Sequence, residues 1–332
     1  MRYRLLVTTV LCLVFLLKSQ VGGGHVFEFV NLPTSPRINA LGGYISSVID
    51  EDLNNGMYNP ALINPLMHNR IALNYTNYYA DIIYGDVGYS FGLREYNIVS
   101  SIKFIDYGNF VETDSYGNEL GVFSAGEYLF SLGVGKVIDS LFCVGVNTKM
   151  AYSSLYEIQS LALMLDFGLT YTHPDHDLNA SIIIKNLGYH LIPYYQGNRE
   201  NLPFEILLGF SNKLAHMPLR WHLTIQHLET PDLGVDNNLS SIYIDNNSLF
   251  NDIFKHFIFG AEFLIHKNVN ILIGYNNRRR SEMIIEDRKA LVGFSTGIVF
   301  KINRFHFNYS RTSQHFSGPI NTFGIITSLK KW

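Results

Sequence analysis

The chain has 332 residues, of which 47% are hydrophobic, 14% are aromatic and only 16% are charged. Soluble domains usually carry about 25% charged residues, so this composition excludes a disordered chain and favours a protein whose surface does not all face water. The formal net charge of −3 gives no electrostatic footprint for nucleic acid. We therefore expect no nucleic-acid partner.

The first residues are typical of a secretory signal peptide. Arg2 and Arg4 form a basic start, an apolar run extends from Leu5 to Leu17, and Lys18 ends it. The run is too short to span a bilayer as a helix, so we predict a leader over residues 1–22. No later stretch has the roughly 20 unbroken apolar residues of a membrane helix. The mature chain is therefore either a soluble periplasmic protein or a membrane barrel.

Residues 23–68 do not alternate in hydrophobicity, and we predict that they form an N-terminal plug segment. Asp50 to Asp52 would start a short helix, because acidic side chains favour the positive end of the helix dipole. Asn59-Pro60 would end that helix, since the residue before a proline is pushed out of the helical region. A second such pair follows at Asn64-Pro65. A segment of this kind ahead of a barrel can fold back and fill the lumen.

The rest of the chain alternates with a period of two. In residues 141–152, "LFCVGVNTKMAY", Phe142 and Val144 lie on an apolar face, whereas Cys143 and Gly145 lie on a face of small and polar residues. Alternation of this kind predicts strands with one apolar face. Fourteen strands are predicted, at residues 70–77, 81–91, 97–107, 127–137, 141–152, 160–171, 178–186, 206–214, 220–228, 257–264, 269–276, 290–300, 305–310 and 321–327.

The lengths of the connections favour a membrane barrel. Connections after even-numbered strands are short, whereas several after odd-numbered strands are long: 108–126, 187–205, 229–256, 277–289 and 311–320. Short periplasmic turns and long outer loops are typical of outer-membrane barrels, which must close because lipid cannot satisfy an open sheet edge. The sequence therefore predicts an all-β fold, a transmembrane antiparallel β-barrel of 14 strands over residues 69–332, with a short N-terminal plug segment containing a helix.

The plug segment and the first strands carry a family resemblance. Asn59-Pro60-Ala61 ahead of fourteen strands resembles the fatty-acid-transporter (FadL-like) barrels. Three longer stretches, Phe27 to Gly43, Asp50 to Tyr89 and Phe104 to Tyr128, are similar to the PorV/PorQ family of the type IX secretion system, and to its PorQ-type members more than to its PorV-like ones. A PorV-like member remains the second assignment.

The resemblance implies a non-enzymatic integral outer-membrane component of the cell-surface attachment complex, with long loops at the surface of a Gram-negative cell. PorQ-type barrels hold PorZ directly and work with PorV and the sortase PorU through that complex, in contact with outer-membrane lipids and lipopolysaccharide. The alternative, from the same barrel class, is a FadL-like channel for the uptake of hydrophobic small molecules.

Two loops contain candidate contact residues. The predicted loop 229–256 is rich in apolar side chains, which usually mark a contact surface but can also fold onto the barrel rim. Its candidate PorZ contacts are Ile242, Tyr243, Leu249, Phe250 and Phe254. Arg278, Arg279 and Arg280 are candidate contacts for lipopolysaccharide phosphate, because Arg suits bidentate phosphate recognition; the simpler interpretation is a solvated loop.

The sequence contains no catalytic constellation and indicates no cofactor. Serines near histidines lack a nucleophile elbow, and no glycine-rich nucleotide loop is present. His173 and His176 in "HPDHD" are better explained by a turn than by a metal site. Charged residues on predicted inward faces either line a ligand path or hydrogen-bond the plug and lumen water: Lys149, Asp166, Lys185, His222 and Glu262. Inward glycines such as Gly135, Gly145 and Gly168 leave room for a plug.

Overall fold

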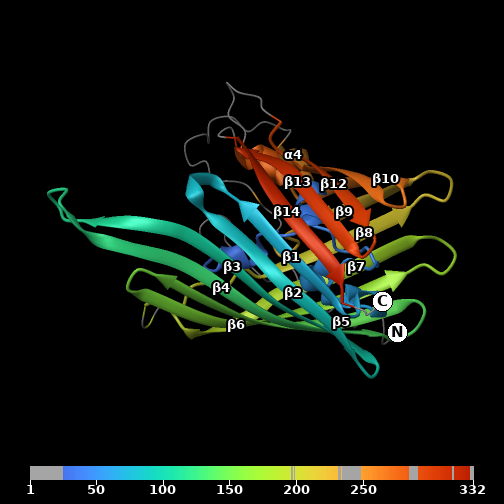
Figure 1. Ribbon diagram of the computed structural model, residues 1–332, viewed down its shortest axis with the longest axis horizontal. Helices are drawn as coiled ribbons and strands as arrows, with labels where there is room; N and C mark the ends of the chain where they lie inside the picture. The colour runs from blue at the N-terminus through green and yellow to red at the C-terminus, as the bar shows by residue number, and fades with distance from the viewer. Residues whose placement is uncertain are drawn as a thin grey trace.

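The computed structural model describes residues 25–195, 197, 199–230, 233, 248–283, 291–315 and 318–329. Its strands form one closed antiparallel barrel in which each strand pairs with its neighbours in sequence, and β1 also pairs with β14 (Figure 1). Closure at this seam runs from Arg70 opposite Ser328 to Asn77 opposite Asn321. The predicted leader, residues 1–22, lies outside the described residues.

The fourteen predicted strands are confirmed, and most of their boundaries shift by only a few residues. They are β1 Arg70–Asn77, β2 Ile83–Leu93, β3 Tyr96–Thr113, β4 Glu119–Val137, β5 Phe142–Leu155, β6 Ile158–Thr172, β7 Leu178–Ile192, β8 Glu205–Lys213, β9 Leu219–Ile225, β10 Phe257–His266, β11 Val269–Asn276, β12 Phe294–Ile302, β13 Phe305–His315 and β14 Gly318–Ser328.

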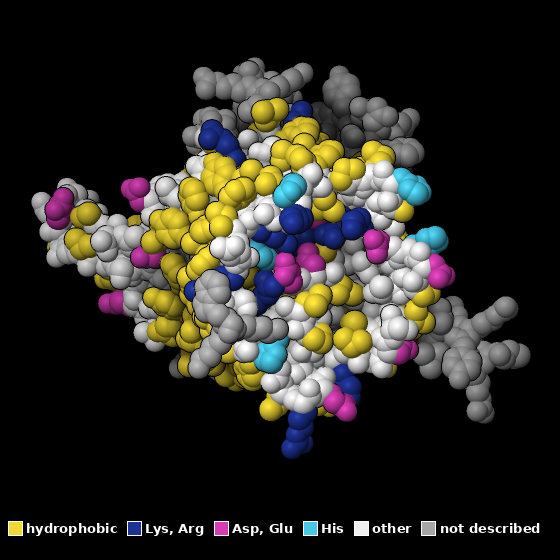
Figure 2. Space-filling view, turned by 45° about the vertical axis from the view of Figure 1, so that its right-hand side comes forward, with side chains coloured by type: hydrophobic (Ala, Val, Ile, Leu, Met, Phe, Trp, Pro, Cys, Tyr) yellow, Lys and Arg dark blue, Asp and Glu magenta, His cyan; other side chains and the backbone are white. Residues whose placement is uncertain are grey.

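The two faces of the strands differ as a membrane barrel requires. On β6, Leu163, Leu165 and Phe167 point outward and are 37–40% exposed, whereas Met164 and Asp166 point inward and are buried. The same alternation continues around the barrel, and apolar side chains form a broad outer band in Figure 2. An apolar exterior around a polar interior is the arrangement of transmembrane β-barrels.

The barrel has two distinct ends. We call the end that carries the connections after odd-numbered strands the long-loop end, and the opposite end the short-turn end. The wall is uneven in height, because β3 and β4 have 18 and 19 residues, whereas β8 and β9 have 9 and 7. The β3–β4 hairpin projects beyond all other strands (Figure 1).

Two of the predicted long connections are wrong. Residues 108–126 mostly extend β3 and β4, which join at 114–118, and residues 311–320 mostly extend β13 and β14. Residues 108–126 contain Asp, Asn and Gly, which are typical of turns, but paired side chains such as Phe110 opposite Phe123 continue the ladder. Cross-strand aromatic pairs stabilise such a ladder.

The segment before β1 lies inside the barrel as short helical turns. These are η1 Glu28–Asn31, α2 Pro36–Ala40, α3 Leu53–Tyr58, η2 Pro60–Leu62 and η3 Pro65–Met67. Three further helical pieces lie in the connections: η4 Tyr79–Asp81, α4 Ser248–Lys255 and α5 Asn277–Met283. Within the described part of the chain, no helix has the length and apolarity needed to cross a membrane.

Candidate functional site: the filled lumen

The Asn59-Pro60-Ala61 turn rests against a row of glycines in the barrel wall. Gly145 on β5 pairs with Gly135 on β4 and with Gly168 on β6, so three positions without side chains lie side by side. A Cβ atom at Gly145 would collide with the carbonyl group of Pro60, and one at Gly168 would collide with the side-chain oxygen of Asn59. The plug backbone therefore occupies the volume that larger residues would fill.

The two Asn-Pro pairs each begin a 3₁₀ turn. The Asn59 side chain accepts a hydrogen bond from the Ala61 amide at 2.9 Å and donates to the Ser46 carbonyl at 2.6 Å. Asn64 likewise accepts from the Leu66 amide at 2.8 Å. Asn is a favoured N-cap residue and Pro suits the first helical position, so each Asn-Pro pair ends the preceding segment and begins a new 3₁₀ turn. The predicted helix is confirmed as α3, with Asp52 as its N-cap.

A charge network around Arg37 ties the plug to β9 and β10. The Arg37 Nε donates to Glu262 Oε1 at 2.7 Å, and its Nη1 donates to Asp50 at 2.7 Å and Asp52 at 3.2 Å. Arg220 donates to the second oxygen of Glu262 at 2.7 Å. Glu262 is fully buried, and a buried carboxylate of this kind depends on its partners because its desolvation is costly.

The short-turn end opens into a charged cavity of about 790 Å³, lined in part by the Arg37 network. Figure 2 shows Lys, Arg, Asp and Glu side chains gathered in this hollow. Glu51 accepts a hydrogen bond from Lys301 at 2.8 Å and pairs with Arg70. Burial alone would raise the pKa of the Glu51 carboxyl, but Lys301 and Arg70 outweigh it and hold this pKa below its ordinary value of 4.5.

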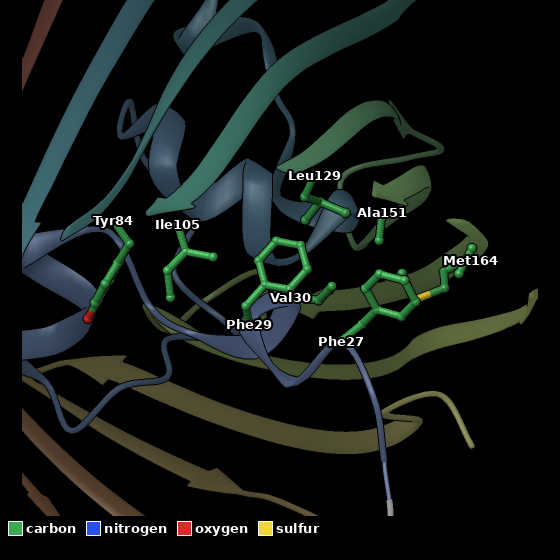
Figure 3. Close-up of a cluster of buried hydrophobic side chains, with 9 residues drawn as sticks. Phe27, Phe29, Val30, Tyr84, Ile105, Leu129, Ala151 and Met164 are labelled. Atoms are coloured by element: carbon green, nitrogen blue, oxygen red, sulfur yellow. The ribbon is translucent and has the colours of Figure 1, made fainter. Parts of the chain in front are cut away.

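Toward the long-loop end, part of the inner wall is apolar and is covered by the start of the plug, beside the buried side chains of Lys103, Lys149 and Lys185. Figure 3 shows Phe27, Phe29 and Val30 pointing at the inner wall. We call this buried layer the apolar slot; its wall residues are Tyr84, Ile105, Leu129, Ala151, Ala162 and Met164. Phe27 also lies 5.7 Å, between ring centroids, from His190 on β7. The chain thus places its own aromatic side chains where the inner wall is apolar.

The wall beside the apolar slot is interrupted. Pairing between β7 and β8 stops at Lys185 opposite Glu205, so among the described strands residues 187–192 of β7 pair only with β6. Their ladder to β6 is itself bulged at Asn186, which adopts φ 58° and whose amide donates to the Asp166 carboxylate at 2.8 Å. Bulges next to a ladder end are common beside functional sites.

The plug segment closes part of this interruption. The Val26 amide donates to the Asn201 carbonyl at 3.0 Å, and His25 forms a parallel bridge with Asn201. Asn31 accepts from the Asn186 side chain at 2.9 Å. A second cavity of about 280 Å³ lies nearby, lined by His25, Asn31 and Tyr44 among others, and it shares no lining residue with the cavity at the short-turn end.

The inward charged residues predicted from alternation are all buried, and two of them reach the plug. Glu262 binds Arg37, and the Lys185 Nζ donates to Asn31 at 3.2 Å. Lys149 instead pairs within the wall, with Asp166 at 2.5 Å. Within the described ranges, no group of three or more His, Cys, Asp or Glu residues could hold a metal ion.

The predicted lipopolysaccharide contacts lie on α5, where the side chains of Arg278 and Arg280 have partners within the protein, whereas the buried Arg279 Nη1 has no hydrogen-bond partner among the described residues. Arg278 donates to Glu282 at 2.6 Å and contacts His227, while Arg280 donates to the Val292 carbonyl at 3.2 Å. The Arg279 amide donates to the Asn276 side chain at 3.0 Å. Phosphate binding by Arg278, Arg279 and Arg280 remains a prediction.

The predicted PorZ-contact loop is described only in part. Ile242 and Tyr243 lie outside the described residues, and Leu249 and Phe250 fall within α4. Phe254, also on α4, is 49% exposed, and its neighbour Ile253 is 57% exposed. The docking role of this loop likewise remains a prediction.

Comparison with known proteins identifies the fold. The CymD monoaromatic hydrocarbon channel superposes with a TM-score of 0.53 and 10% sequence identity, over 92% of this chain and 100% of that chain. The Pseudomonas putida toluene transporter TodX gives a TM-score of 0.51 at 10% identity, over 90% and 99% of the two chains. A Pseudomonas aeruginosa FadL homologue gives 0.47 at 9% identity, over 90% and 98%.

No family model matches the sequence, and no curated protein matches it either. At these identities the structural likeness shows the fold alone. The chain therefore has the barrel fold of TodX and CymD, which are a toluene transporter and a monoaromatic hydrocarbon channel.

Proposed function

We propose that this protein is a non-enzymatic outer-membrane channel for small hydrophobic molecules. The observation that carries the proposal is the apolar slot, because it is a buried apolar site occupied by three side chains of a terminal segment rather than by the wall itself. A hydrophobic ligand of similar size would replace Phe27, Phe29 and Val30 with little change in the apolar area removed from water.

The first part of the plug, residues 26–32, is held less firmly than the part that follows it, residues 33–67. Among the described residues, residues 26–32 form hydrogen bonds with the barrel but no ion pair with it; these include the bonds from Lys103 to the carbonyls of Val30 and Leu32 at 3.0 and 2.8 Å. Phe27 adopts φ 61°, a conformation that costs a bulky residue about 1–2 kcal/mol and that is released on displacement. Residues 33–67, by contrast, are fixed by the Arg37 network and by the packing of the Asn59-Pro60-Ala61 turn against Gly135, Gly145 and Gly168.

The interrupted wall supplies an entrance. Residues 187–192 lack a β8 partner and lie next to Phe27 through His190. A molecule dissolved in the outer leaflet would pass between this edge and residues 199–204, and would meet the apolar slot directly. TodX and CymD are a toluene transporter and a monoaromatic hydrocarbon channel, which supports small aromatic or aliphatic hydrocarbons as the ligand class.

Uptake of a labelled alkylbenzene or fatty acid by cells with and without the protein tests the proposal. Leu129→Gln puts an amide into the apolar slot and is expected to reduce saturable uptake by about tenfold, since an unpaired buried amide opposes apolar binding. Phe307→Ala is the matched control, because Phe307 is 41% exposed on the outer face. Uptake that is not saturable, or that Leu129→Gln leaves unchanged in a correctly folded barrel, contradicts the proposal.

A second candidate function is the docking role in the type IX attachment complex, and the exposed pair Ile253 and Phe254 on α4 supports it. In this role the barrel holds PorZ at the cell surface and acts with PorU and PorV. Deleting Asp236–Asp252 together with Ile253→Ser and Phe254→Ser, and measuring whether PorZ still co-purifies, tests it. Loss of PorZ with unchanged barrel yield favours docking, whereas unchanged recovery rejects this loop as the contact.

A further inference from the structure

We propose that the tip of the β3–β4 hairpin is a docking arm for a protein partner with a basic surface. Beyond Asp106 opposite Ile83, β3 no longer pairs with β2, and β4 pairs with β5 only from Ala125 onward. Residues 107–113 and 119–124 therefore pair only with each other. We call this two-stranded part, with its turn, the arm; it projects past the barrel in Figure 1.

The arm is ordered by its own contacts and by Tyr156 of the β5–β6 turn, whose hydroxyl donates to Glu112 at 2.7 Å. At its turn, the Asp114 carboxylate accepts from the amides of Tyr116 and Asn118 at 2.9 and 2.8 Å, and also from the Asn118 side chain at 2.8 Å. On one face, the Phe110 and Phe123 rings stack with centroids 5.4 Å apart, and Tyr156 covers Phe123. A preorganised arm of this kind pays little ordering entropy on binding.

The other face presents apolar side chains with no cover among the described residues. Val111 lies opposite Val122 in the ladder, and these side chains are 54% and 69% exposed. Leu120, at the register shift next to Gly121, is 63% exposed, and Tyr116 at the turn is 90% exposed. Exposed apolar residues gathered on one element indicate an interaction surface.

Charge identifies the partner. Residues 104–135 contain no Lys, Arg or His, whereas the arm and its base carry Asp106, Glu112, Asp114 and Glu119. Four carboxylates without a base oppose contact with anionic lipid or with a second copy of the same arm. They attract a partner rich in Lys and Arg, which would also cover Val111 and Val122 and can add a strand to either free edge.

The test uses the full-length protein in cells, with a photo-crosslinking amino acid placed at Val122 and, as control, at the lipid-facing Phe307. The expected result is a protein adduct at Val122 that is absent at Phe307, with a captured protein that has a Lys- and Arg-rich surface. Its yield from isolated membranes is expected to fall about tenfold when NaCl rises from about 0.05 to about 0.5 M, because salt screens exposed charges.

Two variants test separately the contributions of charge and of apolar contact to partner binding. Glu119→Lys and V111S/L120S are each expected to reduce the adduct by about tenfold, since the first removes charge complementarity and the second the apolar contact. Heat-modified gel mobility confirms that each barrel is folded. Deleting Asp236–Asp252 is expected to leave the adduct intact, which distinguishes the arm from the α4 loop.

Three outcomes overturn the proposal: no protein adduct at Val122, an adduct with twice the mass of this chain, or an adduct that neither salt nor Glu119→Lys weakens.

Discussion

The carbonyl group of Pro60 lies where a side chain at Gly145 would have to be. This contact joins the plug, through the Asn59-Pro60-Ala61 turn near its C-terminal end, to strand β5 of the wall. The neighbouring Gly135 makes the same kind of contact, because a Cβ atom there would lie 2.5 Å from the Ile63 carbonyl oxygen. The position of the plug is therefore determined by where the wall lacks side chains.

Gly145→Ala is expected to loosen the plug without opening the barrel. The added methyl group must displace the Pro60 backbone, and overpacking of this kind typically costs about 1–3 kcal/mol. Hydrogen exchange of residues 57–64 should accelerate, while exchange of β5 stays slow. Gly92→Ala is the control, since its Cβ would meet His68 at ordinary distances of 3.6–3.7 Å. Equal protection of residues 57–64 in both variants would contradict the account.

Replacing Arg37 by Met is expected to destabilise the plug severely, by about 3–5 kcal/mol, because it leaves the buried Glu262 with one fewer cation. The double variant R37M/E262M should recover only part of that loss, since it removes the unpaired Glu262 but leaves the buried Asp52 without Arg37 and leaves Arg220 without Glu262. Hydrogen exchange of the plug and denaturant unfolding measure the loss of stability in the single and in the double variant. If the double variant is as unstable as the single one, the unpaired charge of Glu262 is not the cause of the lost stability.

Glu51, in the charged cavity at the short-turn end, should make the stability of the plug depend on pH. Its pKa in the folded protein lies below 4.5 because Lys301, Arg70 and His306 surround it. A carboxyl group with a lowered pKa stabilises the folded state above its unfolded pKa, and this contribution is lost as the pH falls through the folded pKa. We expect plug hydrogen exchange, corrected for intrinsic rates, to accelerate below about pH 4.5, and to do so less steeply in Glu51→Gln.

Glu95→Gln is the matched control for this prediction, because Glu95 pairs with Lys136 at the exposed β2–β3 turn, away from the plug. It should leave the pH dependence of plug exchange unchanged. If Glu51→Gln and Glu95→Gln behave alike, Glu51 does not fix the plug.

The strands could be predicted from the sequence because lipid on one side and the lumen on the other impose a period of two. The plug helix could also be predicted, since Asp52 and Asn59 are local capping signals. The hairpin arm could not, because its sequence, with Asp, Asn and Gly among its apolar residues, does not keep the alternation of the other strands. Its pairing depends on cross-strand contacts such as Phe110 with Phe123.

The candidate site was harder to predict. Inward glycines were visible in the alternation, but the alignment of Gly135, Gly145 and Gly168 depends on strand register. Arg37 lies 225 residues from Glu262 in the sequence, and no local pattern links them. Phe27 and Phe29 alternate with Glu28 in "VFEFV", and this was the one signal that could have indicated the apolar slot.

The most direct measurement is to label the purified protein, in lipid vesicles, with a photoreactive alkylbenzene and to map the labelled residues by mass spectrometry. The account predicts labels on Phe27–Val30 and on wall residues such as Leu129 and Met164, and it predicts that excess unlabelled alkylbenzene suppresses them. Labels confined to lipid-facing residues such as Phe307, with no suppression by competitor, would contradict it.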